Sequence, residues 1–102
     1  MSDPVYIAHL RDVFNKVHEC EAKHVETVPV IERWQGKTVW EGEVEIFRLS
    51  GYPKATKGYA WSYDRNAIGS ENVCVLELSP VISPSTAVQT WIGGKMREQA
   101  RN

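Results

Sequence analysis

A stretch in the middle of the chain, residues 28–63, constrains the fold most, because it holds three strand-like runs separated by two turn signals. The turns are Gln35–Lys37 and Ser50–Pro53, whose glycines and proline favour chain reversal. The runs are rich in β-branched and aromatic residues, which are typical of strands. Because short connections join antiparallel neighbours, the stretch predicts a meander, and residues 72–78 extend it by a fourth strand.

Helical patterns flank the expected strands on both sides. Asp3 followed by Pro4 is a typical helix start, and apolar residues then recur at helical spacing to about Ala22. Ser83 and Pro84 repeat the start signal before an apolar cluster at residues 87–92, and two glycines then weaken the helix. The sequence therefore predicts an α+β fold of order αββββα, a four-stranded antiparallel meander with two helices, in a single domain spanning residues 1–102.

Composition excludes several classes of partner. The net charge of −1 is spread without a concentrated basic footprint, which argues against a nucleic-acid-binding domain. No apolar run approaches the ~20 residues that span a bilayer, and no signal-peptide pattern opens the chain. We therefore expect a cytoplasmic protein with no nucleic-acid or membrane partner. Its two cysteines, Cys20 and Cys74, are most simply buried apolar residues, although a disulfide between them stays open.

The second and third expected strands carry apolar residues on both faces. In residues 38–49, Val44 and Ile46 alternate with Phe47 and Leu49. Two helices on one side would leave such a sheet partly uncovered, so either a helix crosses to the second face or another chain covers it. We expect self-association as a homo-oligomer, most simply a dimer, with two large aromatic residues at the contact: Trp40 and Trp91.

The position of each strand in the sheet also follows from the sequence. Pro29 cannot donate a ladder hydrogen bond, so its strand should lie at an edge or carry a bulge. The aromatic strand Tyr59–Tyr63 lies well inside the chain order and should be central. Gly42 within the second strand indicates a bulge, a bend or the close approach of another backbone.

Part of the chain resembles a family of small uncharacterised bacterial proteins that recur among the mobile gene cassettes of integrons. The resemblance covers roughly residues 24–92 and implies a bacterial protein that is often a homo-oligomer, without supplying catalytic residues. Tyr52 stands where the family has His before Pro53. The residues that carry the resemblance are His24-Val25-Glu26, Val28-Pro29-Val30, Thr38-Val39-Trp40, Gly42, Val44-Glu45, Gly51, Pro53-Lys54-Ala55 and Tyr59-Ala60-Trp61-Ser62.

Two polar segments are candidate sites with simpler alternatives. His18, Cys20, Glu21 and His24 are metal-ligating types in one short segment, but they would point in different directions on a helix, and a polar helix end explains them equally well. Glu41, Glu43 and Glu45 share one strand face, which is most simply a solvated face. Glu45, at mid-strand between Val44 and Ile46, is the one most expected to have a partner. We expect no metal and no cofactor.

A third candidate combines basic and aromatic residues. Lys54 and Lys57 lie among Tyr52, Tyr59, Trp61 and Tyr63, which could hold an anionic aromatic ligand, or form an aromatic core with two surface lysines. The candidate ligand-binding residues are Trp40, Glu45, Lys54, Tyr59 and Trp61.

Three functions stay open on the sequence. The first is a non-enzymatic homo-oligomeric protein that binds a small molecule or a protein partner in an aromatic-lined pocket or interface. The second is a small enzyme that uses a carboxylate and a His, Glu45 and His24, in an aromatic-lined pocket. The third, nucleic-acid binding, is disfavoured by charge. No nucleophile motif is present, so the sequence assigns no catalytic residue.

Overall fold

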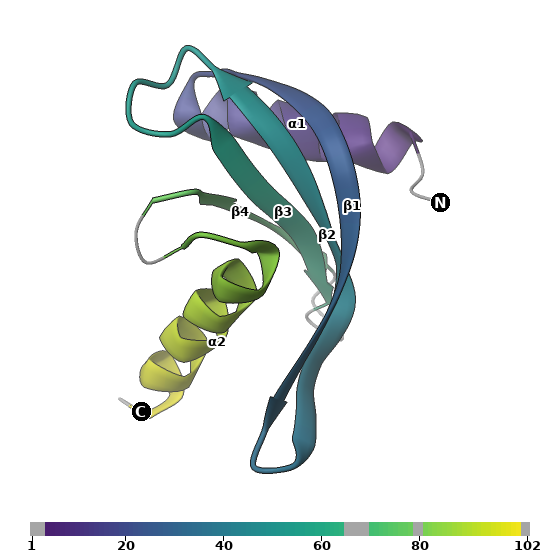
Figure 1. Ribbon diagram of the computed structural model, residues 1–102, viewed down its shortest axis with the longest axis vertical. Coiled ribbons are helices and arrows are strands. Elements are labelled where there is room, and N and C mark those ends of the chain that lie inside the picture. Colours follow the sequence, from purple (N-terminus) through teal and green to yellow (C-terminus); the bar gives the residue numbers. More distant parts are fainter. Residues whose placement is uncertain (1–3, 65–69, 79–80, 101–102) are drawn as a thin grey trace.

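The computed structural model describes residues 4–64, 70–78 and 81–100, and it has the expected αββββα order (Figure 1). Asp3 of the expected helix start lies outside the described residues. The elements are α1 Pro4–His18, β1 Glu21–Trp34, β2 Lys37–Ser50, β3 Lys57–Asp64, β4 Ser70–Leu76 and α2 Pro84–Ala100.

The four strands form one antiparallel sheet in the order β1-β2-β3-β4. β1 lies at an edge, as Pro29 predicts, and the aromatic strand β3 lies between β2 and β4. Gln35 and Gly36 both adopt positive φ, 52° and 79°, between the paired residues Trp34 and Lys37. Positive φ at both central residues is the geometry of a two-residue hairpin turn. The meander and its first turn are thus confirmed.

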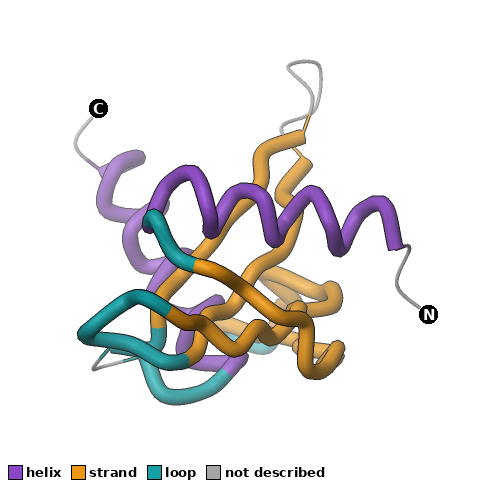
Figure 2. Tube along the Cα trace, turned by 90° about the horizontal axis from the view of Figure 1, so that it is seen from above, coloured by secondary structure: helices purple, strands orange, loops and turns teal. Residues whose placement is uncertain are grey.

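The two helices cover opposite faces of the sheet (Figures 1 and 2). α1 places Leu10 and Phe14 against the face that holds Phe47, Leu49 and Ala60. α2 places Ala87 and Val88 against the face that holds Val44, Ile46, Tyr59 and Trp61. The alternation expected along β2 and β3 is therefore confirmed, and of the two ways to cover the second face, the chain uses a helix of its own.

β2 and β3 stay together over only part of their lengths. They pair from Glu45 with Ala60 to Arg48 with Lys57, while β1 and β2 pair all the way to the turn at Trp34 and Lys37. The far part of the β1–β2 hairpin consequently projects beyond the other strands (Figure 1). Glu45 marks the point at which β2 and β3 separate, and alternation in the sequence gave no sign of this split.

The first helix is shorter than its apolar pattern predicts. It ends at His18 rather than near Ala22, and Glu19 follows in the left-handed region with φ of 53°. A left-handed residue ends a helix, because it turns the backbone out of the helical path. Glu21 and Ala22 instead pair with Ser50 and Leu49 of β2. This segment therefore belongs to the sheet and does not continue the helix.

Two glycines allow close approaches that a side chain would block. A Cβ at Gly58 would lie 2.5 Å from the Phe14 ring, so α1 rests directly on the backbone of β3. A Cβ at Gly42 would lie 3.0 Å from the Trp40 ring, which folds back along its own strand. The group that approaches Gly42 is thus the side chain of Trp40 and not another backbone, which was one of the alternatives that the sequence left open.

Gly58→Ala should destabilise the protein by about 1–3 kcal/mol, since the added methyl group overpacks the contact between Phe14 and β3. Gly93→Ala is the matched control, because Gly93 lies within α2 and nothing comes within 4 Å of an added Cβ. That change should stabilise the helix by about 0.5–1 kcal/mol. Urea unfolding midpoints measure both, and equal midpoints for the two variants would contradict the packing of α1 on Gly58.

Candidate functional site

Glu45 is a fully buried carboxylate on the face that α1 covers, with 1% of its surface exposed. Its Oε1 lies 2.9 Å from Nε2 of His24 and also accepts a hydrogen bond from the hydroxyl group of Thr27. The His24 ring packs edge-on against Phe47, with ring centroids 5.5 Å apart. A buried carboxylate is costly unless it is paired and hydrogen-bonded, so this site depends on both partners.

A β-bulge brings both partners of Glu45 to the same face of the sheet. His24 pairs with Phe47, whereas Glu26 pairs with Ile46, which leaves Val25 as an extra residue in β1. Residues three apart on a regular strand point to opposite faces, but the extra residue reverses the alternation between His24 and Thr27. Bulges re-aim side chains in this way. From Pro29 the sequence predicted an edge position or a bulge for this strand, but it gave no indication that a bulge lies at Val25.

An open pocket of about 530 Å³ lies beside this cluster, between α1 and the first two strands. One face of α1 lines it with residues spaced i, i+3, i+4 and i+7, and His24 and Thr27 of β1 and Glu43 of β2 complete it. His24 is 30% exposed, so its ring connects the buried carboxylate with the pocket. The α1 residues that line the pocket are Pro4, Ile7, Ala8 and Arg11.

Tyr6 and Cys74 extend the cluster beneath α1. Burial raises the pKa of the Tyr6 phenol, and the Glu45 carboxylate adds to the rise, while hydrogen bonding to Ser62 opposes it. Burial also raises the pKa of the Cys74 thiol, to about 12. Both groups therefore stay protonated and neutral around Glu45 at neutral pH. Neither residue was expected beside Glu45, because only the fold brings α1 over β4.

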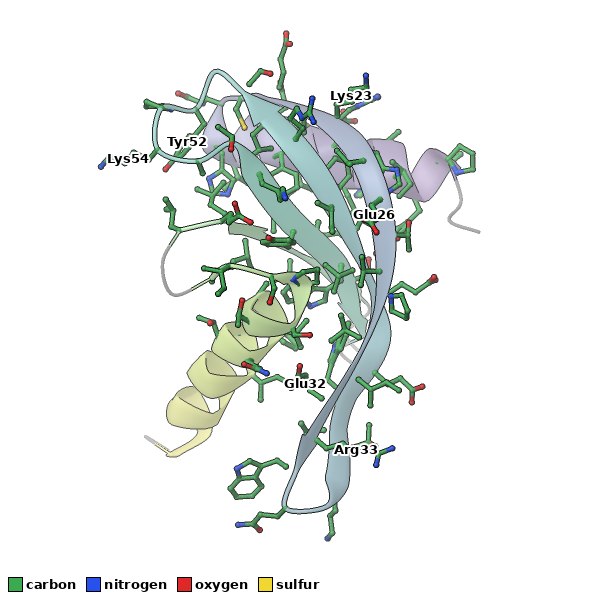
Figure 3. The ribbon with its side chains drawn as sticks, in the orientation of Figure 1. Lys23, Glu26, Glu32, Arg33, Tyr52 and Lys54 are labelled. Carbon is green, nitrogen blue, oxygen red and sulfur yellow. The ribbon has the colours of Figure 1, made fainter. Side chains whose placement is uncertain are left out.

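None of the five expected ligand-binding residues lines this pocket. Tyr59 and Trp61 are buried on the opposite face, beneath α2, with Trp40 packed beside them. Lys54 is exposed in the β2–β3 connection and points away from the sheet, near Tyr52 (Figure 3). Of the five expected residues, only Glu45 belongs to the cluster with His24, since strand alternation separates it from the aromatic residues.

Three tryptophans stack within this one chain. The Trp61 ring is edge-on to both Trp40 and Trp91, with centroids 5.9 and 5.8 Å apart. Trp40 and Trp91, expected at a contact between chains, are thus half-buried against their own core. Nε1 of the buried Trp61 has no hydrogen-bond partner within the part of the chain that the structure describes.

The metal-ligating residue types around Cys20 do not form a cluster. His18 ends α1 and its ring lies edge-on to Tyr52, while His24 is bonded to Glu45. Among the described residues, no group of three His, Cys, Asp or Glu side chains could hold a metal ion. Cys20 and Cys74 are both free thiols.

Comparisons with known proteins add no identification. No family model, no curated protein and no solved structure matches the chain. Within residues 4–64, 70–78 and 81–100, no helix is both long and apolar enough to cross a membrane. The chemistry of the site therefore has to be inferred from its geometry.

Glu45→Ala should destabilise the protein by about 1–3 kcal/mol, because His24 and Thr27 lose their shared hydrogen-bond acceptor. Glu43→Ala, two residues away on the same strand face but exposed, should change the free energy of unfolding by less than about 0.5 kcal/mol. Urea unfolding of the two variants beside the parent tests this. A parental midpoint for Glu45→Ala would show that the buried carboxylate is not a stabilising centre.

Alkaline pH should destabilise the protein partly through Cys74. Burial raises the pKa of its thiol from 9.0 to about 12, so between these values the unfolded chain loses a proton that the folded chain retains. The contribution is fully present below pH 9 and is lost as the pH rises toward 12. Cys74→Ala should make the decline in unfolding free energy between pH 8 and 11 shallower by on the order of 1–2 kcal/mol. Parallel declines in parent and variant would contradict this.

Proposed function

We propose that the protein binds a small molecule in the pocket beside α1, and that His24, oriented by Glu45, exchanges a proton with the bound molecule. One observation carries the proposal: a fully buried carboxylate is hydrogen-bonded to a histidine whose side chain is 30% exposed and lines a pocket of about 530 Å³. Pockets of this size hold small ligands, and a carboxylate behind an imidazole fixes its orientation for acid–base work.

The hydrogen bonds determine which ring nitrogen of His24 would act. When the Glu45 carboxylate accepts a hydrogen bond from Nε2–H, Nδ1 is the ring nitrogen that is left to act as the base. Nδ1 makes no hydrogen bond to any residue that the structure describes. If His24 takes a proton from a bound molecule, the resulting imidazolium forms an ion pair with Glu45, which stabilises the charge.

The residues around the pocket favour proton transfer over covalent catalysis. No serine, cysteine or lysine is among the described residues that line it, and the Thr27 hydroxyl group already donates to Glu45. A covalent route needs a nucleophile beside a base. This is the second of the functions left open by the sequence, in a pocket with an aliphatic wall in place of the expected aromatic lining. A purely binding protein would use the same pocket without moving a proton.

The experiment combines binding with proton exchange. A panel of small acids, amines, amino acids and ketones at millimolar concentration is added to ¹⁵N-labelled protein, and the signals of His24 and of backbone amides 24–27 are followed. We expect at least one compound to shift these signals. In D₂O a bound compound that has a C–H bond next to a carbonyl or carboxyl group should exchange that hydrogen faster with the parent than with His24→Gln, since the base is absent there.

His9→Gln is the matched control, because His9 is exposed on α1 and does not line the pocket. It should behave as the parent in both measurements. Exchange that is equally fast with His24→Gln would refute the proton-transfer role, and a panel in which no compound moves the His24 signals would refute binding in this pocket.

A further inference from the structure

The same pocket carries two opposite charges that have no partner within the described protein. Arg11 of α1 and Glu43 of β2 both line it. Neither side chain makes an ion pair with any residue that the structure describes, although both occur in one pocket with His24. A cation and a carboxylate that stay apart around one cavity can each bind a group of opposite charge on a ligand.

The wall between these charges is apolar. Pro4, Ile7 and Ala8 occupy the part of α1 that faces the pocket, so a ligand there meets aliphatic surface as well as charge. Apolar lining with a few placed polar groups is the common design of small-molecule sites. The arrangement suits a molecule with an apolar body and two ionic groups.

We propose that the pocket takes a small zwitterion, a molecule that carries both a carboxylate and an amine, of which an amino acid with an apolar side chain is the simplest example. Arg11 would pair with its carboxylate group, because guanidinium and carboxylate match in geometry. Glu43 would pair with its ammonium group. The inference rests on the proposed function, since it names the ligand class for the same pocket.

His24 gives this ligand class a chemical consequence. The hydrogen on the carbon between the amine and the carboxylate group is the one whose removal a base in the pocket would assist. Removal passes that proton to Nδ1 of His24 and leaves the electron pair on the carbon, and return of a proton restores the C–H bond. No oxidant or leaving group is needed for this exchange.

A matched series of three compounds tests the ligand class. The three compounds share one apolar body. L-Phenylalanine carries both charges, 3-phenylpropanoate carries only the carboxylate, and 2-phenylethylamine carries only the ammonium group. We expect the shifts of the His24 signals to give phenylalanine a Kd about fivefold or more below the Kd of either other compound. Each of the other two compounds lacks one of the two ion pairs, and one exposed ion pair is worth about fivefold in affinity.

Single substitutions test which pocket residue binds each charged group of the ligand. Arg11→Gln should raise the Kd for phenylalanine and for 3-phenylpropanoate about fivefold and leave 2-phenylethylamine unchanged, and Glu43→Gln should weaken phenylalanine and 2-phenylethylamine in the same way. Arg33→Gln and Glu41→Gln are controls of the same chemistry. Both residues are exposed on the projecting hairpin, where Figure 3 labels Arg33, and neither lines the pocket. They should bind all three compounds as the parent does.

The outcomes separate this inference from the proposed function. Equal binding of all three compounds at His24 would overturn the zwitterion class and leave the proposed function standing. Absence of binding by all three would also overturn the class, while the wider panel and its proton exchange decide the proposed function. A Kd series that is insensitive to Arg11→Gln and Glu43→Gln would overturn the assigned pairing.

Discussion

Both faces of the paired part of β2 and β3 are apolar, and the placement of every other element depends on this. Val44 and Ile46 need cover on one face, and Phe47 and Leu49 need it on the other. A chain with two helices satisfies both by sending one to each side, which α1 and α2 do (Figure 1). The contact of α1 at Gly58 then brings this helix close enough to β3 to bury the Glu45 face as well.

The packing of α1 on this face also buries one carboxylate, that of Glu45. Glu45 lies at the last residue pair that β2 shares with β3, on the face of the sheet that α1 covers. Its burial costs free energy that His24 and Thr27 offset through hydrogen bonds. Because His24 also reaches the pocket, the group that stabilises the carboxylate is the one that a bound molecule would meet. Structure and proposed chemistry therefore depend on the same hydrogen bond.

The sequence predicts local features well and long-range partners poorly. Alternation along β2, the turn at Gln35 and the edge position of Pro29 follow from residue types a few positions apart, and all are confirmed. Glu45 was expected to have a partner, and His24 was considered beside it. Their contact nevertheless depends on the bulge at Val25, which strand alternation does not reveal. Tyr6 and Arg11 were missed because only tertiary packing brings α1 to this face.

Self-association stays a proposal, but the two residues that were expected at the contact no longer support it. The sequence argument was surplus aromatic surface, with Trp40 and Trp91 at the contact, but both rings pack on Trp61 of the same chain. Among the described residues, Trp34 near the end of the β1–β2 hairpin is the one aromatic side chain among the large exposed apolar residues, and it is 56% exposed. Large aromatic residues anchor protein contacts only when a partner can bury them. We therefore propose that a homo-oligomer of this protein would use the projecting hairpin, with Trp34 in place of Trp40 and Trp91 at the contact.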